Sequence, residues 1–516
     1  MSHLTGTDRE QLSMFPISID EMVGQDNPVR IIDLFVDLFD LEKLGFKHSI
    51  TAEEGRPPYH PADLMKLYVY GYLNRIRSSR KLETECSRNI ELIWLMKGLH
   101  PSFRTIAGFR SRHAVQIKNF FREFVALLQG WDLVEGKLIA IDGSKFRAVN
   151  ARKNNFNERK LTEQLTYIDL RIESYISQLD NEDKEEHGDR KIDTAKIKEQ
   201  IKKQQQRKRK YLALQEELKK SGQDQISTTD KDARSMPINH GRIEVSYNMQ
   251  TAVDAKNSLI VHYENTNTND RKALSGLAAE VKNVLHKESI EVLADKGYHN
   301  GEELDLCAKN NIITYVAVPD SPRSCEIPTP DYYGDKFIYD PKKDVYICPQ
   351  KKILKGSGRW YTKGNGSKYV NQVKHYKTPA CKNCPVKALC TRNKNGRLIE
   401  RSQYAEAVEI NAKRILLEKD KYLLRQEIVE HPFGTVKRQW GFDYILLKGL
   451  QKNESDFGLI FTVYNLRRLI TIVGIDELKR RLQKAWRTFL QSICSISRFG
   501  SKLFLPCYSD TECAIG

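Results

Sequence analysis

Long apolar runs are missing from this 516-residue sequence. No stretch reaches the length of about 18 consecutive apolar residues that a membrane-spanning helix requires. The first residues also lack the charged and apolar pattern of a secretory signal peptide. These absences argue against a membrane or secreted protein, and we expect a cytoplasmic one.

Cysteine is also scarce, because ten cysteines in so long a chain cannot form a disulfide scaffold. Several are scattered and are expected to be buried or free thiols: Cys86, Cys307, Cys494, Cys507 and Cys513. Four others gather late in the chain: Cys348, Cys381, Cys384 and Cys390. One Cys-x-x-Cys pair with two further cysteines nearby can form a tetrahedral zinc site. Free thiols or a redox pair are the alternatives.

Acidic residues are outnumbered, with 67 Asp and Glu against 84 Lys and Arg, which gives a net charge of +17. Such an excess suits a polyanionic partner, and without a membrane signal nucleic acid is the leading candidate. The hydrophobic content of 40% is sufficient for folded cores. A chain of this length is expected to form two to four domains.

Residues 1–130 are predicted to be a helical, DNA-binding domain. A helix should begin at Pro61, a second should cover residues 79–96, and a third should follow residues 105–113. Arginines lie close to the expected helix junctions: Arg75, Arg77, Arg80, Arg104, Arg110 and Arg112. This arrangement suits contact with the DNA backbone, and a helix-turn-helix is one form that such contact could take. A helical bundle with a solvated basic face is the alternative.

A buried strand is predicted at residues 138–141 (Leu-Ile-Ala-Ile), within the segment 131–150. Asp142 and Gly143 follow it at once. A strand that ends in a carboxylate is a common way to place an acid at a substrate site. Asp142 could instead open a turn or cap a helix.

The segment 151–228 is predicted to be a helical hairpin, since two runs with apolar residues at helical spacing flank a charged stretch. Its second arm is strongly basic. A solvated face, contact with DNA and dimerisation all remain open for it.

Strands return in the segment 229–320. Residues 246–254 and 258–263 predict an antiparallel hairpin, a helix follows, and residues 289–294 form a strand that ends at Asp295 before Gly297. Another helix and a strand over residues 312–318 complete the pattern. This order is the one expected of an α/β, ribonuclease H-like core, in which the first and fourth strands are neighbours. Asp142 and Asp295 should therefore lie side by side.

The remaining segments are an insertion at 321–410, which carries the four clustered cysteines, a helix-rich core part at 411–475, and a tail at 476–516. The core part contains Glu427 and Glu430, which lie on one side of a predicted helix. Either glutamate could be a surface ion-pair partner.

Three motifs give the chain a resemblance to bacterial insertion-sequence transposases of the DDE class, over roughly residues 15–475. They are Ile141-Asp142-Gly143-Ser144, Ala294-Asp295-Lys-Gly297-Tyr298, and the surroundings of Glu430. The resemblance is to the group with an InsH-type helical N-terminal domain. In related transposases the third acid lies in a pattern of Tyr, two residues, Arg, three residues, Glu, six residues, Lys. Tyr422, Arg425, Glu430 and Lys437 keep the outer gaps, but four residues separate the arginine from the glutamate, so Glu427 remains an alternative.

The resemblance implies a site in which Asp142 bridges two Mg²⁺ or Mn²⁺ ions, and Asp295 and Glu430 each hold one. Tyr422, Arg425 and Lys437 would lie near DNA phosphates. Water would cut at the element end, and the freed 3′-OH would attack target DNA. The implied setting is a homodimer on DNA, at the bacterial nucleoid.

Other acids fit capping or turn roles better: Asp230, Asp232 and Asp254. Two rival functions remain open at this point. One is a metal-dependent nuclease or resolvase that does not join strands. The other is a non-catalytic DNA-binding regulator derived from a transposase.

Overall fold

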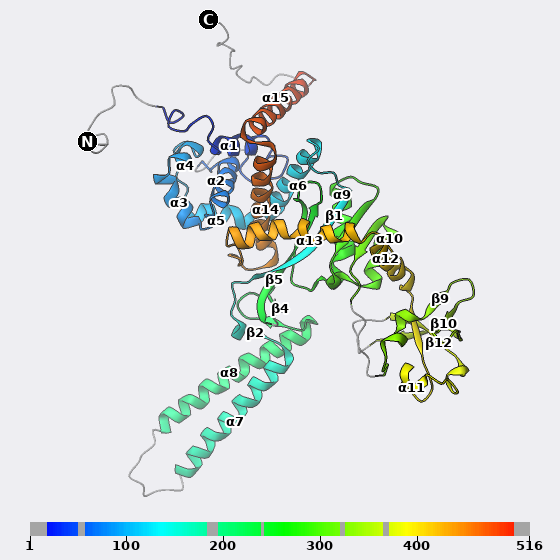
Figure 1. Ribbon diagram of the computed structural model, residues 1–516. Helices are drawn as coiled ribbons and strands as arrows, with labels where there is room; N and C mark the ends of the chain where they lie inside the picture. The colour runs from blue at the N-terminus through cyan, green and yellow to red at the C-terminus, as the bar shows by residue number, and fades with distance from the viewer. Residues whose placement is uncertain are drawn as a thin grey trace, which may run out of the picture. The chain divides into compact units, whose positions relative to one another are not determined.

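The computed structural model describes residues 18–49, 57–182, 194–238, 242–319, 326–364 and 371–499. The chain forms two compact units, and each is assembled from stretches that are distant in the sequence. The first unit combines Met1–Leu127, Phe146–Tyr247 and Gly434–Gly516. The second combines Leu128–Lys145 and Asn248–Phe433. Figure 1 shows the elements.

The N-terminal part of the first unit is helical, as predicted. Its helices are α1 (Val29–Asp37), α2 (Pro61–Leu73), α3 (Ser79–Arg88), α4 (Ile90–Leu95), α5 (Phe103–Arg112) and α6 (Ala114–Gly130), the last of which continues into the second unit. Pro61 does begin a helix. The single helix predicted over residues 79–96 is wrong, because Asn89 is extended and interrupts it. The Asn89 side chain accepts hydrogen bonds from the Glu91 and Leu92 amides and so caps α4.

Two C-terminal helices complete the helical part of the first unit. Helix α14 (Leu450–Val473) is buried over most of its length and packs against α2 and α5. Helix α15 (Ile475–Phe499) covers much of the predicted tail, and residues 500–516 lie outside the described part of the chain. Within the described residues no single helix is long and apolar enough to cross a membrane; only α14 with residues 475–488, bent by 113°, passes as a pair by length and composition.

The predicted helical hairpin is present as α7 (Glu158–Glu182) and α8 (Thr194–Ser221), which lie side by side (Figure 1). Its turn, residues 183–193, lies outside the described residues. A small apolar cluster holds the base of the hairpin: Phe156, Leu161, Leu218 and Ile226. Two short strands meet there, β2 (Asn155–Phe156) and β3 (Ile226–Ser227).

The second unit contains a mixed sheet with the strand order β6-β5-β1-β7-β8. Its strands are β1 (Leu138–Arg147), β5 (Ile243–Asp254), β6 (Leu259–Thr266), β7 (Ile290–Ala294) and β8 (Ile312–Val316). β1, β7 and β8 are parallel, whereas β5 and β6 form the predicted antiparallel hairpin. The helices α9 (Leu274–Val284) and α10 (Gly301–Lys309) connect the strands. The N-terminal end of β5, which belongs to the first unit, pairs with β4 (Arg234–Pro237).

Strand β1 continues past Asp142, where the sequence predicted that it would end. The backbone remains extended through Gly143 to Arg147. Phe146 is fully buried and packs edge-on against Phe457, and the Arg147 amide donates to the Asp443 carbonyl. Packing and backbone pairing therefore extend the strand, and Asp142 lies near its middle.

The predicted insertion forms an antiparallel sheet of its own, in the order β13-β12-β11-β10-β9. The strands are β9 (Ile338–Asp340), β10 (Val345–Ile347), β11 (Ile353–Lys363), β12 (Asn371–Lys377) and β13 (Ile399–Ser402). A short helix, α11 (Lys387–Cys390), precedes β13. The core of this sheet consists of Phe337, Tyr346, Leu354, Tyr376 and Ile399.

The predicted glutamate-bearing helix is α13 (Lys419–Phe433), which follows α12 (Ala405–Leu417). Pro432 lies in its last turn, and the next six residues, Gly434–Gln439, form a π-helix. Proline lacks the N–H group that an α-helix uses, so the change of helix type occurs where that hydrogen bond is lost.

Candidate active site

Asp142 and Asp295 lie on adjacent parallel strands. Leu138 pairs with Glu291 and Ala140 with Leu293, so the same register places Asp142 beside Asp295, directly after β7. Each carboxylate accepts a local backbone hydrogen bond: Asp142 from the Gly143 amide at 2.9 Å and Asp295 from the Gly297 amide at 2.7 Å. The predicted proximity of these two acids is present in the structure.

The electrostatic environment of Asp142 is unfavourable for a free carboxylate. Burial raises its pKa to about 6, and the negative charges of Asp295 and Asp270 add to the rise. The guanidinium of Arg425 and the Gly143 N–H act in the opposite direction but do not cancel it. Acids that repel one another in a partly desolvated place are stabilised by a divalent cation, which takes hard oxygen ligands.

A third acid near Asp142 was missed by the sequence reasoning. Asp270 accepts hydrogen bonds from Lys145 Nζ at 2.9 Å, and from the side-chain amides of Asn248 and Gln250 at 2.7 Å each. Burial opposes its ionisation, yet Lys145 and the two amides outweigh that effect and lower the pKa of Asp270. Gln250 also accepts a hydrogen bond from the buried hydroxyl of Tyr298.

This polar cluster lies directly against the backbone of Gly143. A Cβ atom added there would come within 2.5 Å of Asp270 Oδ1, 2.6 Å of Gln250 Nε2 and 2.9 Å of Asn248 Oδ1. A larger residue at this position would therefore have to displace the hydrogen-bonded side chains of the cluster. The sequence did contain a signal for the cluster, since Asn248 and Gln250 lie on one face of β5, a strand that is buried over most of its length, and both are fully buried.

Among the described residues, Glu430 does not form a group with the two aspartates that is close enough to hold a metal ion. Glu430 is exposed on α13, and Gln426 Nε2 donates to its Oε1 at 2.8 Å. Glu427, the alternative acid, is also exposed. Arg425 of the same helix is half-buried and close enough to lower the pKa of Asp142. The middle of α13 is therefore near the aspartates, but through its arginine.

The other members of the predicted signature lie on either side of that position. Tyr422 is half-buried one turn before Arg425. Lys437 belongs to the π-helix of the first unit, and its ammonium lies 4.3 Å from the centre of the Phe146 ring.

The acids that sequence reasoning set aside have structural roles. Asp254 is fully buried and accepts hydrogen bonds from the backbone amides of Gly136 at 2.8 Å and Lys256 at 3.0 Å. Asp230 accepts hydrogen bonds from the Tyr247 hydroxyl at 2.8 and 2.9 Å. Asp232 accepts one from the Leu450 amide, at the start of α14. Capping and turn roles therefore explain all three.

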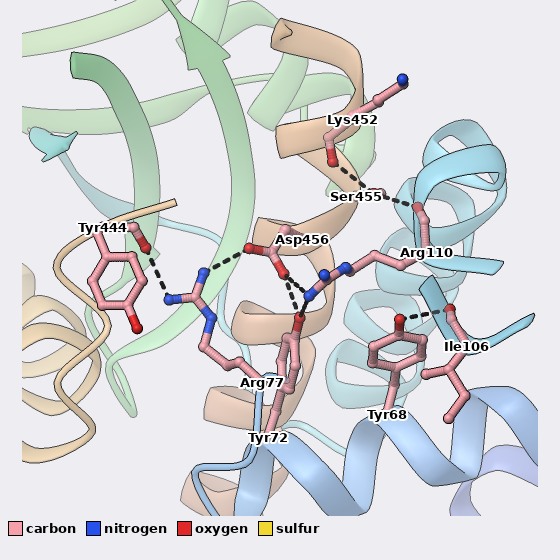
Figure 2. Close-up of polar contacts among 9 residues, drawn as sticks. All are labelled: Tyr68, Tyr72, Arg77, Ile106, Arg110, Tyr444, Lys452, Ser455 and Asp456. Atoms are coloured by element: carbon pink, nitrogen blue, oxygen red, sulfur yellow. Dashed lines mark hydrogen bonds and ion pairs between the residues drawn. The ribbon is translucent and has the colours of Figure 1, made fainter. Parts of the chain in front are cut away.

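Arg110, which was expected to contact DNA from the surface of α5, is buried in an ion-pair network. Its Nη1 donates to Asp456 Oδ1 at 2.9 Å and to the Tyr72 hydroxyl at 2.6 Å (Figure 2). Only 4% of Arg110 is exposed, so its charge is used inside the protein. Arg104 and Arg112, the other two predicted contacts on α5, are exposed.

The four clustered cysteines are free thiols in the structure. Burial raises the pKa of Cys390, and the charges of Cys381, Cys384 and Cys348 raise it further against the opposing effect of Arg397. These thiols therefore lie within electrostatic range of one another. Across the described ranges, however, no three or more His, Cys, Asp or Glu side chains are gathered closely enough to hold a metal ion.

Two family models match the chain. Residues 17–112 match a model described as "Transposase domain (DUF772)", and residues 347–470 match one described as "Transposase DDE domain". The second match includes α13 with Glu430. The two matches indicate an insertion-sequence DDE transposase, and they support a DNA transposase with transposase enzyme activity.

One solved structure aligns with this chain over most of the length of both chains. It is the cryo-EM structure of a piggyBac transposase synaptic complex with hairpin DNA, at 8% identity, with 92% of this chain and 83% of that chain covered. The TM-score is 0.27, which does not establish a shared fold.

Proposed function

We propose that this transposase cuts the ends of its element by metal-dependent phosphodiester hydrolysis and joins the freed 3′-OH to target DNA. The observation that carries the proposal is the placement of Asp142 beside Asp295 on adjacent strands. Arg425 of α13 lies close enough to Asp142 to lower its pKa. The strand order, with three parallel strands and an antiparallel hairpin at one edge, supports a ribonuclease H-like catalytic core.

Asp142, Asp295 and Glu430 are the proposed ligands of Mg²⁺ or Mn²⁺. The two aspartates fit such ions, since burial and then the charge of Asp295 raise the pKa of Asp142, and a bound cation would offset both effects. Divalent cations at such carboxylates activate an attacking oxygen and stabilise a leaving oxygen in phosphodiester cleavage. Glu430 would join the set once its side chain leaves Gln426, since it is exposed and free of ion pairs in the described contacts.

The remaining site residues act on the substrate in this proposal. Arg425 would hold a phosphate next to the aspartates, and Tyr422 and Lys437 would contact the same strand. Lys145 and the amides of Asn248 and Gln250 keep Asp270 fixed, and Asp270 with its partners fixes the backbone that carries Asp142. Arg104 and Arg112 would contact the DNA backbone from α5.

The test uses a DNA segment in which a marker lies between the two ends of the element, together with a target plasmid. We expect nicked or cut ends, and products in which the 3′ end is joined to the plasmid, with Mg²⁺ or Mn²⁺ and none with a chelator. Cut ends without joined products would instead favour a metal-dependent nuclease that does not join strands. DNA binding with neither cut nor joined DNA would contradict catalysis and would favour a DNA-binding regulator.

The identity of the third acid can be tested with a matched pair of variants on α13. We expect Glu430→Gln to lower cleavage by about 10³-fold, because losing a metal ligand costs several kcal/mol of transition-state stabilisation. Glu427→Gln removes the same charge from the same helix face, and we expect a change within a few-fold. Single-turnover cleavage rates of both variants decide between the two. A loss confined to Glu427→Gln would reverse the assignment.

We also propose a structural zinc ion at Cys348, Cys381, Cys384 and Cys390. The support is that the charges of the other three thiols affect Cys390, together with the preference of thiolates for zinc. Because no three of these side chains are close enough in the described residues to hold a metal ion, zinc binding would have to draw them together. Protein purified without chelator should contain about one zinc per chain, and Cys384→Ser should lower both the zinc content and the stability of this insertion. A zinc content well below one per chain, measured by elemental analysis, would remove this proposal.

A homodimer on DNA is proposed because two element ends have to be held together for joining. Mass measurement of the complex with end DNA should show two chains. A complex that contains a single chain would contradict it.

A further inference from the structure

A pocket of about 650 Å³ in the first unit has no role in the chemistry described so far. It is lined by the turn before α3, the start of α3, part of α5, and residues 440–446 after the π-helix. All of these stretches belong to the first unit. Its volume is in the range of sites that bind small molecules or single nucleotides.

The pocket is strongly cationic. Its basic lining residues are Arg75, Arg77, Arg80, Lys81 and Arg110, and none of the lining residues in the described part of the chain is acidic. Behind it, Asp456 is the carboxylate that pairs with both Arg77, at 2.6 Å, and Arg110, at 2.9 Å (Figure 2). One carboxylate shared by two buried guanidinium groups leaves an excess positive charge at the pocket wall, and an anion in the pocket would balance it.

Three residues that line the pocket carry buried hydrogen-bond donors without a partner among the described residues. Trp440 is 5% exposed and lines the pocket, and its indole N–H has no partner among the described residues. The Nε–H groups of Arg77 and Arg110 are likewise buried and without a partner in that part of the chain. The amino end of α3, a ten-residue helix, contributes the positive end of its dipole. These groups call for an oxygen-rich, negatively charged ligand.

The walls carry aromatic rings beside the cations. Arg80 lies over the Phe103 ring at 5.1 Å, and Arg77 lies over the Phe442 ring at 4.6 Å. Arg75 has a φ of 62°, a left-handed conformation that glycine adopts more easily, so the backbone itself does not explain an arginine there. Phosphate-binding cations interleaved with rings are typical of surfaces that bind a nucleic-acid strand.

We propose that this pocket binds the backbone of the DNA strand that the transposase handles. A phosphate would lie against Arg75, Arg80, Lys81 and the amino end of α3, and accept a hydrogen bond from Trp440. The adjoining sugar or base would pack on the aromatic wall. The inference rests on the DNA transposase function but is independent of the metal site.

The test measures binding of the full chain to a labelled duplex of about 30 base pairs of random sequence, in chelator, over a series of salt concentrations. Arg75→Gly, Arg80→Gln and Lys81→Gln are combined, since all three side chains are exposed and Arg75→Gly also relieves the backbone. We expect affinity to fall at least about tenfold and the slope of log K against log salt to shrink by about one to two. The melting temperature should not fall.

The matched control removes the same charge from an exposed part of the insertion: Lys342→Gln, Lys343→Gln and Lys351→Gln. We expect a smaller loss of affinity and little change in slope. Trp440→Phe keeps the ring and removes its N–H donor, and should weaken binding by about three- to tenfold. If the pocket triple variant binds DNA as the control does, the proposal is wrong.

A last arm separates DNA from a small anion. If inorganic phosphate raises the melting temperature of the wild type more than chloride at equal ionic strength, while the triple variant keeps its DNA affinity, the pocket is a small-anion site and the DNA assignment fails. Every binding measurement is made in chelator, where no metal-dependent cleavage occurs. The pocket proposal and the proposed active site can therefore fail independently of one another.

Discussion

Asp142→Asn is expected to abolish cleavage of the element ends, by at least about 10³-fold, while DNA binding is unchanged. The amide oxygen of asparagine can still accept the hydrogen bond of the Gly143 amide, so the local backbone is preserved. What is lost is the negative charge beside Asp295, and with it the affinity for divalent cations. Single-turnover cleavage and a binding assay in chelator measure the two properties separately.

The same variant should be more stable than the wild type when no divalent cation is present. Burial raises the folded-state pKa of Asp142 to about 6, so the folded protein holds a proton that the unfolded chain has already released. Stability is therefore lost as pH rises from the ordinary aspartate pKa of about 4 to about 6. Above that window the charged carboxylate costs up to about 3 kcal/mol, which asparagine does not incur.

Melting curves at several pH values check this expectation. The difference between variant and wild type should be largest near pH 8, vanish near about pH 4, and shrink when Mg²⁺ binds and stabilises the wild type. Equal melting temperatures at every pH, with cleavage intact in the variant, would show that Asp142 lies outside the metal site.

The second large effect is expected from Asp456→Asn, at the buried ion-pair network of the first unit. Asp456 is fully buried and accepts hydrogen bonds from Arg77, Arg110 and Tyr72 (Figure 2). Burial opposes its ionisation, but the two arginines outweigh that effect and lower its pKa. Removing the charge leaves two buried guanidinium groups without a counterion, which should cost about 3–5 kcal/mol. Calorimetric or urea unfolding would measure the loss.

Glu163→Gln is the control for this prediction. Glu163 pairs with Arg159 on the exposed surface of α7 at 2.7 Å, and breaking such a pair should cost no more than about 0.5 kcal/mol. Replacing Asp456, Arg77 and Arg110 together by apolar residues should cost less than Asp456→Asn alone, since no unpaired charge remains. A loss of stability near that of Glu163→Gln would mean that water reaches the arginines.

Much of the order of elements could be predicted because apolar periodicity and turn residues act locally. The strands β5, β6, β7 and β8 and the helices α7 and α8 follow their patterns in the sequence. Two errors have distant or subtle causes. Asn89 interrupts a helix because its side chain caps the next helix instead of letting the first one continue. β1 extends past Asp142 because Phe146 packs on Phe457, which lies far along the chain.

The candidate site was predictable where the chain brings an acid to adjacent parallel strands, as for Asp142 and Asp295. The site was harder to predict where the role of one polar side chain is to hold another polar side chain in place. Asp270 follows a strand without a motif of its own, and its role depends on Lys145 and Gln250 reaching it in space. Arg110 looked like a surface cation because its partner, Asp456, is 346 residues away.

The first unit is completed by a stretch that follows the whole of the second unit in the sequence. Arg77 and Arg110 leave the ribosome long before Asp456 and Trp440, which the structure places beside them or in the same pocket. Until that stretch emerges, the N-terminal helices lack their counterion and α14, the helix that packs on them. A nascent chain that has not yet reached α14 therefore cannot form the finished unit, so the N-terminal helices and α14 have to fold together.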